Sequence, residues 1–232
     1  FKLKPADVVY SSYINGSGWQ NEVKNGVLSG TTGESKAVGG IKIKLSGKSV
    51  TGNIQYSAHI QDKGWDDWKQ NGDVSGTADG KKRLEAIKIQ LTDEMAKHYD
   101  IYYRVHVQNF GWLGWAKNGE AAGTEAYSYR VEAIEIKLLD KGAESPGSTV
   151  NAFKKRCASV QYSAHSQNIG WQSYVSDGGT AGTVGKSLRL EALKIRLANM
   201  KYGGGIRYSA HVQNIGWQPF VTSDSISGTV GE

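Results

Sequence analysis

The stretch that decides the fold is Ile206-Arg-Tyr-Ser-Ala-His-Val-Gln-Asn-Ile-Gly-Trp217, because the sequence contains it in five related versions. The other four versions occupy residues 8–19, 54–65, 101–112 and 160–171. Their closing tryptophans are spaced by 46, 47, 59 and 46 residues, so one insertion of about a dozen residues accounts for the odd interval. Self-similarity at this period predicts a fold built from five copies of one unit.

Each repeat is predicted to consist of short β-strands separated by turns. It opens on a run such as residues 54–61, in which alternate positions are apolar or aromatic, and a turn then leads to the Gly-Trp pair. The repeat closes on a strand such as residues 83–91, where the alternation slips at Glu-Ala and predicts a β-bulge. Between them lies a Gly-Thr pair, whose glycine follows the tryptophan by eleven residues in all five repeats: Gly30, Gly76, Gly123, Gly182 and Gly228.

The two ends of the chain suggest how the repeats are arranged. Repeat five stops at residues 228–232, before a closing strand, whereas residues 1–4 (Phe-Lys-Leu-Lys) read like one. Because an unpaired sheet edge favours aggregation, we expect the N-terminal strand to fill that gap. The sequence therefore predicts an all-β chain with one domain over residues 1–232, a closed five-bladed β-propeller. A β-trefoil or β-prism made from three repeats, followed by an incomplete second unit, is the alternative.

The repeats are expected at about residues 8–53, 54–100, 101–159, 160–205 and 206–232, the last completed by residues 1–4. No run is long enough to span a membrane, and the N-terminus lacks the layout of a signal peptide. The single cysteine, Cys157, excludes an internal disulfide framework. The net charge of +6 comes from lysines and arginines that alternate along strands, so solvated strand faces are favoured over nucleic-acid binding. We expect a monomer or part of a longer surface protein, without membrane insertion.

Recurring ionisable residues favour a structural role over catalysis. Histidines recur at one strand position, with no second ligand at metal-binding spacing, so we expect each to be half-buried and bonded to a carbonyl or to the recurring glutamate. These histidines are His59, His106, His165 and His211. The glutamates Glu85, Glu132 and Glu191 are predicted to pair with Arg83, Arg130 and Arg189. Catalysis needs different groups that converge on one pocket, whereas every repeat offers much the same residues. The sequence predicts no enzyme, no cofactor and no metal.

The pattern Tyr-Ser-Ala-His-x-Gln-Asn-x-Gly-Trp, then Gly-Thr, then Arg-Leu-Glu-Ala-Ile-Lys-Ile resembles the clostridial hydrophobic repeat with a Trp, the ChW family. The resemblance covers essentially the whole chain outside residues 140–159. It implies a secreted or surface protein of Gram-positive, clostridia-like bacteria, with a role in adhesion, polysaccharide attachment or host contact. It supplies no residue-level mechanism. Repeat one departs from the pattern, with Tyr13 for the histidine, Glu22 for the second aromatic residue and Gly39 for the glutamate.

Repeated aromatic residues are the candidate binding site. A tryptophan face can stack on a sugar while asparagine binds its hydroxyls; alternatively, each tryptophan packs in the seam between repeats. The candidates are the Gly-Trp tryptophans Trp19, Trp65, Trp112, Trp171 and Trp217, the second aromatics Trp68, Trp115, Tyr174 and Phe220, and the turn residues Asn109, Asn168 and Asn214. Asparagine at these positions is also typical of turns.

We therefore expect a non-enzymatic, extracellular recognition or adhesion module that binds glycans or polysaccharide at several weak sites at once. The alternative is recognition of a host protein, such as an immunoglobulin or glycoprotein, through a face that only repeat three carries: Phe110, Leu113, Trp115, Tyr127 and Tyr129. A structural spacer within a surface protein is the third hypothesis.

Overall fold

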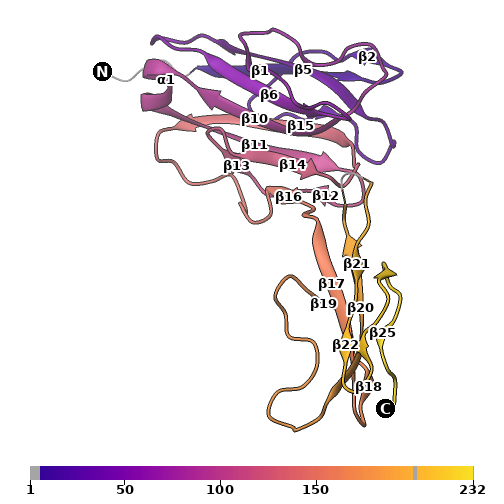
Figure 1. Cartoon of the computed structure of the whole chain (residues 1–232). Helices are drawn as coiled ribbons and strands as arrows, with labels where there is room; N and C mark the ends of the chain where they lie inside the picture. Colours follow the sequence, from indigo (N-terminus) through magenta and orange to yellow (C-terminus); the bar gives the residue numbers. More distant parts are fainter. Residues whose placement is uncertain (1–5, 201–202, 232) are drawn as a thin grey trace. The chain divides into compact units, whose positions relative to one another are not determined.

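A computed structural model describes residues 6–200 and 203–231 (Figure 1). Strands dominate these residues, and the predicted all-β class with five repeats is confirmed. The sequence predicted one domain, but contacts divide the chain into two compact units, Phe1–Lys155 and Arg156–Glu232. The division falls inside the one insertion, between repeats three and four. Residues 1–4, the predicted sealing strand, lie outside the described residues.

Unit 1 contains the first three repeats. Repeat one has strands β1 (Asp7–Ile14), β2 (Gly18–Trp19), β3 (Val23–Lys24), β4 (Ser29–Gly30) and β5 (Val38–Ser46). Repeat two has β6 (Ile54–Ile60), β7 (Gly64–Trp65), β8 (Lys69–Gln70), β9 (Ser75–Gly76) and β10 (Leu84–Leu91), and helix α1 (Asp93–His98) follows it. Repeat three has β11 (Tyr99–Val107), β12 (Gly111–Trp112), β13 (Ala116–Lys117), β14 (Ala121–Glu125) and β15 (Val131–Asp140), and β16 (Phe153–Lys155) ends the unit.

The opening and closing strands of each repeat form an antiparallel pair: β1 with β5, β6 with β10, and β11 with β15. The register of β6 and β10 shifts between Leu84 and Ala86, so the predicted bulge at Glu-Ala is confirmed. The extra residue changes the parity of the strand, and Leu84 and Ile87 are therefore both buried, each 2% exposed.

The Gly-Thr strands link the three repeats into a cycle. β9 of repeat two pairs with β5 of repeat one, and β14 of repeat three pairs with β10 of repeat two. β4 of repeat one then pairs with β15 of repeat three, which closes the cycle after three repeats. The predicted five-bladed propeller is not confirmed, because no sheet of the described chain joins all five repeats. In this cycle the Gly-Thr strand of each repeat pairs with the closing strand of another, which is the arrangement expected from the three-repeat alternative.

One tyrosine from each repeat anchors the core between the sheets of unit 1. Tyr10, Tyr56 and Tyr103 are fully buried, and their hydroxyls donate to the carbonyl oxygens of Val27, Asp73 and Glu120. The main-chain N–H of Ile136 in turn donates to the Tyr10 hydroxyl over 3.1 Å, which ties repeat three to repeat one.

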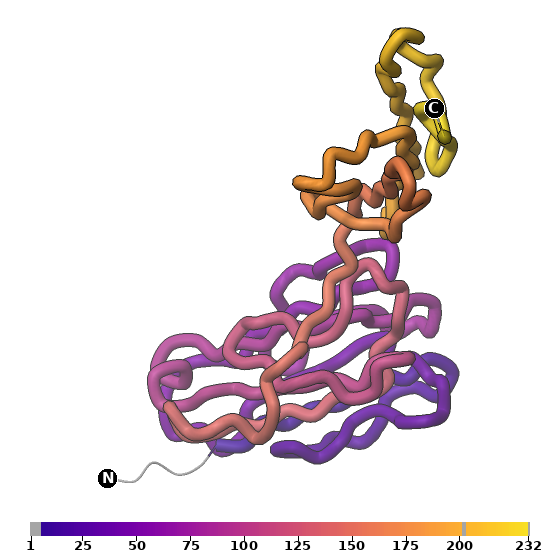
Figure 2. The backbone as a smooth tube through the Cα atoms, turned by 90° about the horizontal axis from the view of Figure 1, so that it is seen from below, coloured from indigo at the N-terminus to yellow at the C-terminus, as the bar shows by residue number. Residues whose placement is uncertain are grey.

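Unit 2 contains repeats four and five, traced from orange to yellow in Figure 2. Repeat four has β17 (Ser159–Ser166), β18 (Gly170–Trp171), β19 (Val175–Ser176) and β20 (Leu190–Ala198). Repeat five has β21 (Arg207–Tyr208), β22 (His211–Val212), β23 (Gly216–Trp217), β24 (Val221–Thr222) and β25 (Ser227–Gly228). β17 pairs with β20, and β25 pairs with β20 as β9 does with β5. Unit 2 thus repeats the pairing of β9 with β5, and its residues fall 152 positions after their counterparts in the first two repeats, as His211 does relative to His59.

Candidate functional site

Each Gly-Trp tryptophan lies beside the aromatic ring of the residue with which it pairs. In repeat two the register places His59 opposite Trp65, and the rings meet edge to face with centroids 5.3 Å apart. Gly64 has a φ of +89°, which only glycine adopts without strain, so the turn before the tryptophan depends on it. The same edge-to-face contact joins Tyr13 to Trp19, His106 to Trp112, His165 to Trp171 and His211 to Trp217.

A cation lies over the tryptophan ring in repeats one to four. The Nζ atom of Lys88, on the closing strand of repeat two, is 4.4 Å from the centroid of the Trp65 ring. At this distance the ammonium is attracted by the negative face of the ring. The equivalent pairs are Lys42 over Trp19 at 4.3 Å, Arg104 over Trp112 at 4.6 Å and Lys194 over Trp171 at 4.5 Å.

Repeat three exchanges the charges around its tryptophan. Lys42, Lys88 and Lys194 each follow their tryptophan by 23 residues, but repeat three has Glu135 at that position. Arg104, from the opening strand, supplies the cation instead, and its Nε donates to Glu135 Oε2 over 2.8 Å. The sequence predicts solvated strand faces for these lysines, and the contact with the tryptophan ring was not predicted. The constant spacing of 23 residues was the signal that could have revealed it.

The predicted His–Glu and Arg–Glu pairs are confirmed in repeats two, three and four. In each repeat one carboxylate oxygen of the glutamate contacts the histidine Nδ1 atom, at 3.3 Å for Glu85, 3.0 Å for Glu132 and 2.8 Å for Glu191. The other carboxylate oxygen forms an ion pair with the arginine of the same repeat. Burial opposes ionisation of Glu85, but His59 and Arg83 outweigh it and hold the pKa of that carboxyl below its ordinary value. Each glutamate therefore links the histidine that contacts the tryptophan, on the opening strand, to the closing strand of the same repeat.

Trp19 and Trp217 are exposed, so the interpretation of these two as buried seams between repeats is not supported, whereas Trp65 packs against Phe153 with ring centroids 6.5 Å apart. Trp19 is 36% and Trp217 is 74% exposed, and Trp65, Trp112 and Trp171 have intermediate exposure. The rings have solvent access while a cation occupies part of their surface.

The second aromatics differ from one another. Trp68 and Phe220 are 45% and 65% exposed, and Tyr174 is partly exposed with the Arg196 guanidinium 3.9 Å from its ring centroid. The prediction that Trp115 is a surface binding residue is wrong, because Trp115 is only 4% exposed. The insertion covers it: the Trp115 main-chain N–H donates to the Ser148 carbonyl oxygen over 2.9 Å, and a Cβ atom at Gly147 would fall 3.2 Å from Trp115 Nε1. Trp115 is therefore not available as a surface stacking residue.

The turn asparagines are exposed and have the positive φ expected of turn formers. Their φ angles are 64° at Asn109, 62° at Asn168 and 62° at Asn214. Asparagine tolerates this left-handed conformation better than most residues, which accounts for its recurrence at the turn.

The aromatic face specific to repeat three is smaller than the sequence suggested. Phe110, Tyr127 and Tyr129 form a cluster with ring centroids 5.3 to 5.7 Å apart, and the Nζ atom of Lys154 lies 5.3 Å from the Phe110 ring. Leu113 and Trp115 are buried and do not belong to this surface.

No group of three or more His, Cys, Asp or Glu side chains is placed to hold a metal ion within residues 6–200 and 203–231. Within the same ranges, the helix is too short and too polar to cross a bilayer.

A family model described as ChW, clostridial hydrophobic W, matches five segments of the chain that together make up well over half of it: residues 13–47, 59–93, 106–140, 165–199 and 211–232. Each segment begins at the residue that contacts the tryptophan ring edge to face. No curated protein matches the chain. No solved structure matches it either.

Proposed function

Because this chain belongs to the ChW (clostridial hydrophobic W) family, we propose that it is a non-enzymatic module that binds polysaccharide outside the cell through its repeated tryptophan–cation sites. ChW repeats are common in surface and cell-wall-binding proteins, and the family is typical of surface or secreted bacterial proteins. The ligand class is inferred from the chemistry of the repeated site.

The observation that carries the proposal is the contact between a partly exposed tryptophan and a cation, as between Trp171 and Lys194 at 4.5 Å. The part of the ring that the ammonium leaves uncovered offers apolar area to the C–H face of a sugar, and the ammonium over the ring attracts a carboxylate or phosphate on the same residue of a polymer. This pairing favours anionic polysaccharides over neutral ones.

Repetition compensates for the weakness of each site. An exposed ammonium contributes only about 0.2–1 kcal/mol to an ion pair in water. Four tryptophan–cation sites on one chain, three of them with a lysine at the same position, raise the avidity for a repeating polymer, because the second and later contacts form within a single complex. A monomeric sugar should therefore bind far more weakly than the polymer from which it comes.

Isothermal titration calorimetry with anionic and neutral polysaccharides tests the proposal. The informative variant is Lys42→Met, Lys88→Met, Lys194→Met, and the control with the same charge change is Lys36→Met, Lys81→Met, Lys186→Met at exposed positions outside the sites. Binding that the first variant loses and the second keeps supports the proposal. Absence of binding by the folded wild-type chain, or equal loss in both variants, contradicts it.

A second candidate function is recognition of a host protein. The observation that favours it is the cluster of Phe110, Tyr127 and Tyr129, which only repeat three carries. Exposed aromatic side chains beside a cation are typical of the centre of protein interfaces. A pull-down in which Phe110→Ala abolishes capture of one stoichiometric protein, and deglycosylation does not, would favour this function over polysaccharide binding.

A further inference from the structure

The tryptophan site of repeat three lies in a pocket of about 380 Å³ that the insertion helps to form. The pocket is lined by the strand residues Arg104, Trp112 and Lys137 and by residues 146–148 and 150 of the insertion. Pockets that bind small molecules measure about 300–1,000 Å³, so this one has room for a sugar residue. Only repeat three carries the insertion, so the other repeats have no such wall.

The insertion is held tightly against the strands, so its wall of the pocket is preformed. The Trp115 main-chain N–H donates to the Ser148 carbonyl oxygen over 2.9 Å. A Cβ atom at Gly114 would fall 2.4 Å from the Val150 carbonyl oxygen, so a glycine is required for this approach. The other repeats have Asn21, Asp67, Ser173 and Pro219 at the position of Gly114. A preformed wall lowers the entropy that binding costs.

The charges that line the pocket leave one cation without a partner. The Arg104 Nε atom donates to Glu135 Oε2 over 2.8 Å, so these two charges balance. Lys137 forms no ion pair with a carboxylate of residues 6–200 and 203–231, and its Nζ atom lies 5.5 Å from the centroid of the Trp115 ring. The pocket therefore has one positive charge in excess.

In two other repeats a carboxylate of the protein neutralises the equivalent cation. Lys44 and Arg196 stand at the position of Lys137, each 25 residues after its tryptophan. A carboxylate oxygen of Glu22 lies 2.6 Å from the Lys44 Nζ atom, and one of Asp224 lies 3.6 Å from Arg196 Nη1. Lys137 lacks this contact, which an anionic ligand can supply.

The stem of Lys137 is held in place by repeat one. A Cβ atom at Gly26 would fall 2.4 Å from Lys137 Cε, so the glycine leaves room for the lysine side chain. The Gly26 main-chain N–H donates to the Ile136 carbonyl oxygen over 2.7 Å, which fixes the two strands at this point. A lysine with a packed stem loses less rotamer freedom when it binds an anion.

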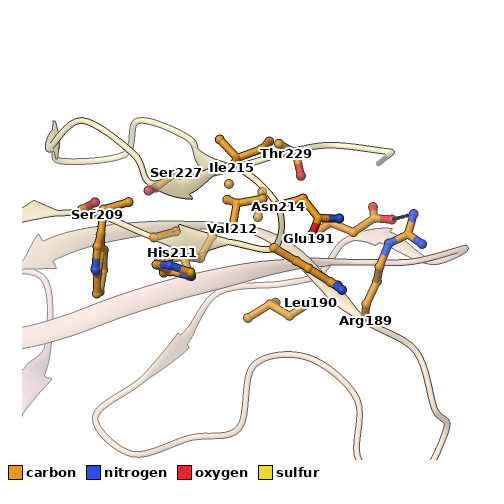
Figure 3. A pocket seen from close by; sticks show the side chains of 16 residues that line it. Arg189, Leu190, Glu191, Ser209, His211, Val212, Asn214, Ile215, Ser227 and Thr229 are labelled. Atoms are coloured by element: carbon orange, nitrogen blue, oxygen red, sulfur yellow. Dashed lines mark ion pairs between the residues drawn. The ribbon is translucent and has the colours of Figure 1, made fainter.

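Unit 2 contains an open groove of about 770 Å³, but its charges are balanced (Figure 3). Arg189 and Glu191, which line it, form an ion pair over 3.1 Å. No lysine is among the residues that line this groove. The pocket of repeat three is therefore the better site for an anion.

We propose that the pocket of repeat three binds a single sugar residue that carries one carboxylate, with the carboxylate at Lys137 and the sugar ring against Trp112. The proposal rests on the proposed function, because Trp112 and Arg104 form one of the four tryptophan–cation sites. One carboxylate matches the single positive charge in excess. The partly exposed Trp112 ring offers apolar area to the C–H face of the sugar.

Glucuronate is the probe, and NMR titration of the full chain follows each tryptophan through its indole N–H signal. We expect saturable shifts of the Trp112 and Trp115 signals, with a Kd on the order of 1 mM. Glucose and acetate each offer only one half of the ligand and should bind at least about tenfold more weakly. Absence of a saturable shift at these two signals, or equal binding of glucose or acetate, overturns the proposal.

Lys137→Met should weaken glucuronate binding at least about tenfold, because it removes the charge and keeps a side chain of similar length. The matched control is Lys81→Met, which removes the same charge at an exposed position outside the pocket and should leave binding unchanged. Unchanged binding by Lys137→Met, or equal weakening in both variants, overturns the proposal.

The variant Lys42→Met, Lys88→Met, Lys194→Met separates this proposal from the proposed function. It leaves the pocket intact, because repeat three has Glu135 at the equivalent position, so it should bind glucuronate as the wild type does while it loses polysaccharide binding. A wild-type chain that binds polysaccharide but gives no glucuronate shift overturns the pocket alone. Glucuronate binding by a chain that binds no polysaccharide supports the pocket and contradicts the proposed function.

Discussion

The α-carbon of Gly30 lies against the main chain of Glu132, so that a Cβ atom at Gly30 would fall 2.4 Å from the Glu132 carbonyl oxygen. The same approach recurs at Gly76, Gly123 and Gly228, each against the closing strand of a different repeat. It explains why a glycine follows each tryptophan at a fixed distance. Gly182 is the exception, since nothing lies within 4 Å of a Cβ atom at that position.

Gly30→Ala should destabilise unit 1 more than Gly182→Ala destabilises unit 2. Both glycines have positive φ, +121° and +107°, so both substitutions carry backbone strain of about 1–3 kcal/mol. Only Gly30 also meets backbone, which cannot move aside cheaply, and overpacking adds about 1–3 kcal/mol. Urea unfolding of the two variants measures the difference. Equal losses of unfolding free energy would mean that the close packing of Gly30 of repeat one on β15 of repeat three does not stabilise unit 1.

Tyr103→Phe should lower the free energy of unfolding by about 1–2 kcal/mol. The substitution removes a buried hydroxyl that donates to the Glu120 carbonyl oxygen and leaves that acceptor without its partner. Tyr13→Phe is the matched control, because Tyr13 is only partly buried and packs its ring on Trp19. Chemical denaturation of both variants, with circular dichroism as the signal, checks the prediction. It fails if Tyr13→Phe costs as much as Tyr103→Phe.

Stability should fall in alkaline solution because of the buried tyrosines. Burial raises the pKa of Tyr10 and of Tyr56 to about 12, whereas the unfolded chain ionises near pH 10. Since the folded pKa is higher, the stabilisation is complete below pH 10 and is lost as the pH rises from about 10 to about 12. Unfolding free energies measured between pH 8 and about 11.5 should show this slope, and Tyr10→Phe with Tyr56→Phe should reduce it. If the double variant shows the same fall of unfolding free energy with pH, groups other than Tyr10 and Tyr56 cause the loss of stability.

The paired glutamates should make the fold sensitive to acid. The pKa of Glu85 is held below its ordinary value, because the contacts with His59 and Arg83 outweigh the burial that opposes ionisation. A lowered folded pKa gives stability that is present above the unfolded pKa, about 4.3, and is lost as the pH falls through the folded value. Glu85→Gln should therefore be less stable than wild type at pH 7, by about 1–3 kcal/mol, and the difference should shrink towards pH 3. A difference that stays constant with pH would show that the charge of Glu85 contributes nothing.

The sequence was sufficient for features that depend on local pattern and insufficient for those that depend on distant contacts. Alternation located the strands, and its slip at Glu-Ala located the bulge that buries Leu84. The size of the cycle was not predictable in this way, because nothing local determines whether Gly30 packs on Ala133 of repeat three or on a later repeat. The burial of Trp115 was missed for the same reason, since the segment around Ser148 that covers it belongs to the insertion.

The exchanged charges of repeat three allow a test of whether the cation over the tryptophan matters. Arg104 lies over Trp112 and pairs with Glu135, whose equivalents in repeats one, two and four are lysines. Glu135→Lys alone places two cations side by side and should lower stability by about 1 kcal/mol or more, while Arg104→Ser alone removes the cation and leaves Glu135 unpaired.

The double variant Arg104→Ser, Glu135→Lys recreates the arrangement of the other repeats, in which a serine on the opening strand faces a lysine on the closing strand. It should recover both stability and affinity for an anionic polysaccharide, so a double-mutant cycle should give a coupling of about 1–3 kcal/mol. Titration and urea unfolding of the four proteins measure it. Additive losses would show that the cation over Trp112 is incidental to the site.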